Sequence, residues 1–166
     1  MILTVDTGAG LLRGPTGEIA CSLGRSGPIA AVDKREGDGA TPLGDWPIRG
    51  LLLRPDRIAP IRTALPWRWI RADDGWSDDA ADPAYNRPVR HPHTHSAERL
   101  WREDPLYDLI VILGHNDAPP AAGMGSAIFL HCWRDRATTE GCVAVAKTDL
   151  IALVERLAPG DVLRIA

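Results

Sequence analysis

The chain has 166 residues, of which 45% are hydrophobic and 25% charged, and its formal net charge is −3 at pH 7. This length predicts a single domain, residues 1–166, with a core large enough to fold without disulfides or a structural metal. The slightly acidic balance and the lack of a basic stripe interleaved with aromatic residues argue against nucleic acid or an anionic membrane surface as partner. No run of about 18 apolar residues occurs, so no membrane span is expected.

The first third of the chain predicts an antiparallel meander of short strands. Fourteen prolines and sixteen glycines are spread along the chain, which favours many turns between strands over a helical bundle. Short apolar segments separated by turn residues predict strands at 2–6, 11–13, 18–23, 29–32 and 46–54. The glycines between residues 34 and 44 match neither the dinucleotide nor the P-loop spacing, so we interpret this stretch as a tight loop and expect no nucleotide cofactor.

A segment rich in proline, aspartate and tryptophan, about 54–104, follows. Three tryptophans lie between residues 67 and 76, and disordered segments are poor in aromatic residues, so we predict a folded, loop-rich insertion that covers a groove. Within it, a short helical turn is expected at 96–102, with Ser96 as its cap. His91, His93 and His95 alternate as strand ligands would, but Pro92 disfavours a regular strand, and we expect a rim loop and no metal.

The second half predicts the most regular elements. Residues 107–115 form a continuous apolar run typical of a buried strand, and a second strand covers 126–131. A helix is expected at 148–157, capped by Thr148 and ended by Pro159-Gly160, before a last strand at 161–166. The predicted fold is mainly β, a sandwich or partly open barrel of short antiparallel strands with one or two packed helices.

His131 and Cys142 are the candidate catalytic pair. His131 ends one apolar run, and Cys142, eleven residues later, opens another after a charged loop, which suits a thiol nucleophile and its base. The alternative is a buried structural cysteine near an unrelated histidine, since free cysteines are usually packed in cores. Of the other two cysteines, Cys132 is expected on the opposite strand face from His131, and Cys21 is also expected to be packed. No CxxC occurs, so a four-ligand zinc site is not expected.

The C-terminal half resembles the YkuD-like L,D-transpeptidase catalytic domain, in its ErfK/YbiS/YcfS/YnhG branch. The matching pieces are Gly-Ser-Ala-Ile-Phe-Leu-His131, a loop, and Gly141-Cys142 followed by apolar residues and a helix. Earlier pieces resemble a compact proteobacterial subgroup, and they are Cys21-Ser-Leu-Gly24, Gly37-Asp-Gly-Ala-Thr-Pro42, Gly75-Trp76, Tyr85-Asn-Arg87 and Glu98-Arg-Leu-Trp-Arg102. Two positions depart from the family pattern. Glu140 occupies the position before Gly141 where the family has a histidine, and Ala144 occupies a position where arginine or asparagine is common.

The resemblance implies a β-sandwich enzyme acting on peptidoglycan, in the periplasm, although the N-terminus shows no signal peptide. It implies Cys142 as nucleophile, His131 as base, the Cys132 backbone carbonyl as its orienter, and N–H groups of Gly141 and Cys142 as the oxyanion hole. The nucleophile would open an L-to-D peptide bond of a stem, and an amine of a second stem, usually on diaminopimelate, would resolve the thioester. The donor carbonyl belongs to diaminopimelate at position three or to L-Ala at position one, and compact relatives are associated with the latter. Carbapenems acylate the cysteine of this family.

Substrate contacts are expected outside the catalytic pair as well. The candidates are His115, Asn116, Thr139, Glu140, Tyr85, Arg87 and Trp101. We expect a monomer whose partners are donor and acceptor stem peptides. Two other functions stay open: an L,D-carboxypeptidase or stem-peptide amidase in which water resolves the acyl-enzyme, and a non-catalytic wall-binding module with the tryptophan-rich insertion as a sugar platform.

Overall fold

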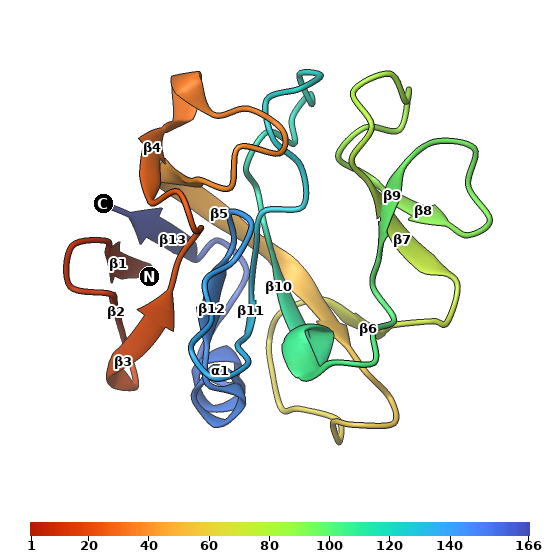
Figure 1. Cartoon of the computed structure of the whole chain (residues 1–166). Coiled ribbons are helices and arrows are strands. Elements are labelled where there is room, and N and C mark those ends of the chain that lie inside the picture. The colour runs from red at the N-terminus through yellow and green to blue at the C-terminus, as the bar shows by residue number, and fades with distance from the viewer.

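The computed structural model describes all residues, 1–166, and short β-strands dominate it (Figure 1). The strands are β1 (Ile2–Asp6), β2 (Leu11–Gly14), β3 (Gly17–Ser22), β4 (Pro28–Ala30), β5 (Thr41–Leu53), β6 (Trp67–Trp69), β7 (Asp74–Ser77), β8 (Pro88–Arg90), β9 (Ala97–Arg99), β10 (Leu109–Leu113), β11 (Phe129–Cys132), β12 (Val143–Val145) and β13 (Val162–Ile165). The helical elements are the 3-10 turns η1 (Ala31–Asp33) and η2 (Pro105–Tyr107) and the single α-helix α1 (Lys147–Val154). No helix is long and apolar enough to span a membrane.

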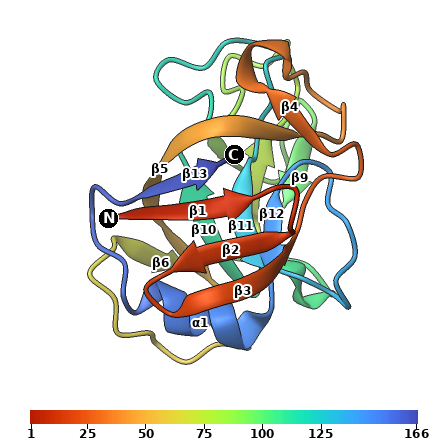
Figure 2. The same cartoon turned by 90° about the vertical axis from the view of Figure 1, so that its left-hand side faces the viewer.

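Eight strands form a closed barrel, which Figure 2 shows from the side of β1 and β2. Their order is β10-β11-β12-β3-β2-β1-β13-β5, and β5 also pairs with β10. This closure depends on the length of β5, because residues 44–47 of that strand pair with β13 and residues 48–53 pair with β10. The prediction of a mainly β fold is confirmed. The barrel is closed where an open barrel or a sandwich was expected, and it is mixed, because β1–β13 and β11–β12 are parallel pairs.

The segment 54–104 contributes β6, which pairs with β5, and a separate three-stranded sheet in the order β8-β7-β9, set beside the barrel (Figure 1). The helical turn expected at 96–102 is wrong. Residues 97–99 form β9, paired with Gly75–Ser77 of β7, so the cross-strand partner overrides the local helical preference of this stretch.

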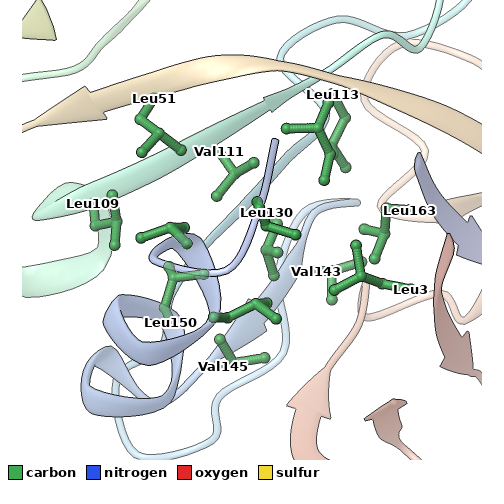
Figure 3. Packing of buried hydrophobic residues seen from close by; sticks show 14 of the residues in the cluster. Leu3, Leu51, Leu109, Val111, Leu113, Leu130, Val143, Val145, Leu150 and Leu163 are labelled. Atoms are coloured by element: carbon green, nitrogen blue, oxygen red, sulfur yellow. The ribbon is translucent and has the colours of Figure 1, made fainter. Parts of the chain in front are cut away.

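Helix α1 begins one residue before the expected cap. Lys147 is its first residue, Ala146 stands at the N-cap, and no side chain caps the helix, so the prediction that Thr148 is the cap is wrong. The helix ends at Val154, and its buried residues Leu150, Leu153 and Val154 join the barrel core. Figure 3 shows Leu150 facing the side chains that fill the barrel.

Strand alternation on β11 and β12 separates the core from the opposite face. Leu130, Cys132, Val143 and Val145 belong to the main core of 23 buried residues, part of which Figure 3 shows. The alternating positions on the same strands therefore point the other way, toward the insertion. There a smaller cluster packs Phe129 edge-on against Trp76 with ring centroids 5.1 Å apart.

Candidate active site

A pocket of about 490 Å³ lies on the outward face of β11 and β12. Four predicted site residues line it together: His131, Thr139, Glu140 and Cys142. Its other walls come from η2, from the loop that precedes Cys142, and from residues of the insertion. The pocket therefore joins the barrel to the segment that was expected to cover a groove.

The parallel pairing of β11 with β12 places Cys142 and His131 on this face. His131 pairs with Ala144 and Leu130 with Val143, so Cys142 lies beside Phe129, two residues before His131. Both candidate residues are buried, with exposed fractions of 8% for Cys142 and 4% for His131. Cys132 has no exposed surface and points into the core, where its Sγ faces the Leu109 carbonyl.

The orientation of the His131 ring is fixed by two contacts. Its Nδ1 lies 2.7 Å from the Cys132 carbonyl oxygen, and the Tyr107 ring packs edge-on with centroids 5.2 Å apart. Because a carbonyl can only accept, Nδ1 carries the proton and Nε2 is left free to accept one. Burial lowers the pKa of His131 to about 4, so the imidazole is neutral at pH 7.

The Cys142 sulfur makes two backbone hydrogen bonds. The Phe129 N–H donates to Sγ at 3.3 Å, and the thiol donates to the Ala127 carbonyl at 3.2 Å. Burial raises the pKa of Cys142 to about 12, against the lowering effect of the Phe129 N–H, and the charge of Glu98 raises it further. The resting pair is therefore a neutral thiol and a neutral imidazole, and not a preformed ion pair.

Thr139 holds the turn that precedes the cysteine. Its hydroxyl donates to the Cys142 carbonyl at 2.7 Å and accepts the Gly141 N–H at 3.1 Å. Two backbone hydrogen bonds connect Thr139 to the loop after β3. Thr139 N donates to Leu23 O and Arg25 N donates to Thr139 O, both at 2.9 Å. The Gly141 N–H is thus engaged, whereas the Cys142 N–H makes no hydrogen bond within the protein.

Glu140, next in the turn, lines the pocket rim and faces solvent. Its carboxylate pairs with the Arg25 guanidinium at 2.9 Å, and its side chain is 77% exposed. The position where the family pattern has a histidine is therefore neutralised by an arginine from the loop after β3.

His115 and Asn116, expected to contact substrate, do not line the pocket. His115 Nε2 bonds with the Met124 carbonyl at 3.0 Å, and the ring packs edge-on against Trp46. Asn116 bonds through its amide to both the N–H and the carbonyl of Ala121. In the structure these two side chains hold the loop between β10 and β11.

The expected insertion residues also lie outside the pocket lining. Tyr85 donates its hydroxyl to Glu36, which does line the pocket, at 2.5 Å. Arg87 donates to the Asp117 carbonyl at 2.6 Å. Trp101 lies under the Arg54 guanidinium, 4.0 Å from ring centroid to Cζ.

The histidines of the 91–95 stretch pair with nearby carboxylates. His93 Nε2 lies 2.7 Å from Asp82, and His95 Nδ1 lies 3.2 Å from Asp79. No group of three histidine, cysteine, aspartate or glutamate side chains in the structure could hold a metal ion.

Several residues that shape the site were not among the predicted site residues, although Glu98 begins one of the stretches noted in the sequence. Asp78 and Glu98 line the pocket from the insertion, and Ser126 and Ala127 line it from the segment before β11. Asn86 lies in the noted Tyr-Asn-Arg stretch, which could have singled it out. Asp78 has no such signal, because its place depends on pairings between distant strands.

A β-barrel with a buried cysteine and a buried, oriented histidine on one pocket wall is the framework of a cysteine-dependent enzyme. The model of the family described as YkuD, L,D-transpeptidase catalytic domain, matches residues 1–165, and the chain belongs to this family. Membership implies cysteine-dependent L,D-transpeptidase activity on peptidoglycan. No curated protein and no solved structure gave a significant match.

Proposed function

We propose that this protein cross-links peptidoglycan stem peptides through a thioester on Cys142, with His131 as general base. The observation that carries the proposal is the placement of both side chains on one wall of the main pocket, with His131 Nε2 free to accept a proton. Buried cysteines that only pack a core do not line such a pocket, as Cys132 illustrates on the neighbouring face.

Acylation begins when Sγ of Cys142 attacks the carbonyl carbon at an L-to-D junction of the donor stem. The raised pKa of Cys142 and the lowered pKa of His131 favour proton transfer to Nε2 as the S–C bond forms, because neither charged form is stable beforehand. The Phe129 N–H, already directed at Sγ, stabilises the developing negative charge. His131 then returns the proton to the leaving amine as the C–N bond breaks, and the thioester remains.

The Cys142 N–H is our first candidate for the oxyanion hole because it has no acceptor in the protein. One such donor typically contributes about 3 kcal/mol to stabilising the transition state. The Gly141 N–H can join it only when the Thr139 hydroxyl releases that hydrogen. The Thr139 hydroxyl thus determines whether the Gly141 N–H is available as the second oxyanion-hole donor. Its other hydrogen bond holds the backbone carbonyl of Cys142 in place.

In the second half-reaction an amine of another stem attacks the thioester, forms the cross-link and frees the thiol. Resemblance to the compact proteobacterial subgroup supports L-Ala at position one as donor and diaminopimelate at position three as acceptor. The substrate supports a periplasmic location, and the proposed nucleophile predicts acylation by carbapenems.

Hydrolysis of the acyl-enzyme, which would make the protein an L,D-carboxypeptidase or amidase, is the second candidate, because the pocket mouth at Glu140 and Arg134 is open to solvent.

The decisive experiment is to incubate the protein with purified disaccharide-tetrapeptide muropeptides and follow the products by mass spectrometry. Dimers identify the transferase, and the fragment that is lost identifies the donor bond. Trimmed monomers alone support the hydrolase. No covalent intermediate and no product with any donor would refute the proposal and leave the wall-binding module as the alternative.

Two cysteine variants provide matched controls for the nucleophile. Cys142→Ala should abolish dimers, trimmed monomers and the carbapenem adduct alike. Cys132→Ala should retain most activity, because that thiol lies in the core on the other face of the strand. An exchange of these two outcomes would overturn the assignment of the nucleophile.

A further inference from the structure

The pocket carries a wall of carboxylates that the acylation chemistry does not use. Asp78 and Glu98 from the insertion and Glu36 from the loop before β5 line the same pocket as Cys142. Burial raises the pKa of Glu98, the Tyr107 hydroxyl and the Arg102 charge act to lower it, and the charges of Asp78 and Glu36 make smaller contributions that raise it. Glu98 is therefore affected by the charges of the other two, and we call these three pocket-lining carboxylates the acidic wall.

Each carboxylate of the acidic wall keeps at least one oxygen without a protein donor. Tyr85 donates to Oε2 of Glu36, and Tyr107 donates to Oε1 of Glu98 at 2.7 Å, so both side chains are held in place with one oxygen free. Asp78 has no hydrogen-bond donor at all, and its Oδ1 is buried. Buried carboxylate oxygens without a partner are rare, because losing their hydration is costly.

A second unpartnered group lies in the same pocket. The Ser126 hydroxyl is buried, with 7% of the residue exposed, and it has no hydrogen-bond partner in the protein. Together with Asp78 Oδ1 it leaves two buried oxygens without a protein partner on residues that line the pocket. The positive lining residues offset the wall only at Glu98: Arg102 is paired with Asp104 at 2.6 Å and lies 3.9 Å from Oε1 of Glu98, and Arg134 is exposed.

We propose that the acidic wall is the subsite for the attacking amine, with Asp78 as the direct partner of a cationic ammonium group. This inference rests on the proposed function and names the part of the pocket that selects the acceptor. An ammonium group has three N–H donors and no acceptor, which matches a set of free carboxylate and hydroxyl oxygens.

The wall also explains how water is disfavoured as the attacking group. The ammonium gives one proton to a wall carboxylate, which releases it to solvent, and the neutral nitrogen then attacks the thioester carbonyl carbon. The C–S bond breaks as the C–N bond forms, a second nitrogen proton passes through His131 Nε2 to Sγ, and the third stays on the new amide. Concentrating a cationic amine next to Cys142 favours this step over hydrolysis.

The test separates the two half-reactions. Wild-type protein, Asp78→Asn, Glu36→Gln and the control Asp73→Asn are first acylated with the donor muropeptide, and the covalent adduct is measured by intact mass. Asp73 is an exposed acid of the same insertion that pairs with Arg90 outside the pocket, so its variant should behave as wild type. The adducts are then resolved with an acceptor stem peptide or with hydroxylamine, which is uncharged at neutral pH.

We expect the two pocket variants to form the acyl-enzyme within twofold of wild type. Cross-linking by the cationic acceptor should fall about tenfold in Asp78→Asn, the loss typical of one charge-assisted hydrogen bond, and less in Glu36→Gln. Resolution by hydroxylamine should be unchanged, and trimmed monomers should increase at the expense of dimers.

Other outcomes overturn the inference in distinguishable ways. Unchanged cross-linking in both variants, or an equal loss with the stem peptide and hydroxylamine, would show that the wall does not recognise the charge of the acceptor. Loss of acylation in Asp78→Asn would place Asp78 in the donor half-reaction instead. No acyl-enzyme even in the wild-type protein would refute the proposed function itself.

Discussion

The side-chain oxygen of Asn86 accepts the backbone N–H of Ala127 at 3.1 Å, and the Ala127 carbonyl accepts the thiol of Cys142 at 3.2 Å. Both Asn86 and Ala127 have positive φ, 55° and 51°, a conformation that is costly for residues other than glycine. The same Asn86 oxygen accepts the Trp76 indole N–H at 2.9 Å, and its amide donates to the carbonyls of His115 and Asn116. The buried Asn86 side chain thus connects the insertion and the loop after β10 to the backbone of Ala127, whose carbonyl accepts the thiol of the proposed nucleophile.

Asn86→Ala should destabilise the protein strongly. Removing the amide leaves the N–H groups of Trp76 and Ala127 buried without acceptors, and two such groups cost about 2–4 kcal/mol of unfolding free energy. Urea denaturation followed by tryptophan fluorescence measures the loss. Asn116→Ala is the matched control, because that amide bonds only within a surface loop and its loss should cost less. Equal losses in the two variants would contradict the central place given to Asn86.

Thr139→Val should slow acylation while Thr139→Ser should not. Valine keeps the shape but loses the hydroxyl that bonds the Cys142 carbonyl and the Gly141 N–H, whereas serine retains it. We expect the rate of adduct formation with a carbapenem to fall about tenfold in the valine variant. This corresponds to an activation free energy about 1.4 kcal/mol higher, because the nucleophile is less well positioned. Stopped-flow or intact-mass kinetics provides the measurement. A serine variant as slow as the valine variant would show that the methyl group, and not the hydroxyl, matters.

The placement of His131 and Cys142, the proposed catalytic pair, on one face could be predicted from sequence because its geometry is local. Two short apolar runs joined by one loop become neighbouring parallel strands, and strand alternation alone puts His131 and Cys142 on one face and Cys132 on the other. Most barrel strands were visible for the same reason, since they are short apolar runs between turn residues, whereas β5 runs through 13 residues of mixed composition.

The acidic wall and the barrel closure could not be predicted in this way because both depend on distant pairings. Residues 97–99 have a helical composition, yet β7 makes them a strand, which in turn brings Glu98 into the pocket. The closure needs β5 to pair with β13 and β10 in succession, and nothing in the pattern of residues 41–53 specifies either partner. The substrate candidates His115 and Asn116 follow the correct strand, but their side chains bond within the connection between β10 and β11 and do not line the pocket.

Gly24→Ala should damage both stability and activity. A Cβ at Gly24 would clash with the Gly39 carbonyl oxygen and lie 3.1 Å from the Gly141 Cα, so the backbone beside Cys142 would have to move. Overpacking of this kind costs about 1–3 kcal/mol. Thermal unfolding and carbapenem acylation should both show the change. Gly8→Ala is the control, because its Cβ would meet only the Asp6 carboxylate at 3.6 Å. An inactive but fully stable Gly24→Ala protein would mean that the shift is confined to the site.

Stability should fall as the pH drops from about 6.5 toward 4. The pKa of His131 is lowered by burial from the ordinary 6.5 to about 4, so over this range the unfolded chain binds a proton that the folded chain does not. The stabilising contribution is fully present above 6.5 and is lost toward 4, an effect of about 3 kcal/mol. Urea unfolding at several pH values should show a shallower fall in His131→Gln than in wild type. Identical slopes would mean that the imidazole is not buried in its neutral form.

The reactivity of Cys142 toward iodoacetamide should keep rising with pH up to about pH 11. Only the thiolate is alkylated, and burial raises the pKa of Cys142 to about 12, so no plateau should occur near neutrality. A preformed thiolate–imidazolium pair would instead give a rate that is flat from pH 6 to 9. Peptide mass mapping separates Cys142 from Cys21 and Cys132, and Glu98→Gln should accelerate the reaction at a given pH, because the Glu98 charge raises the thiol pKa. If Glu98→Gln leaves the profile unchanged, the acidic wall does not act electrostatically on the nucleophile, and its influence is confined to the amine that it binds.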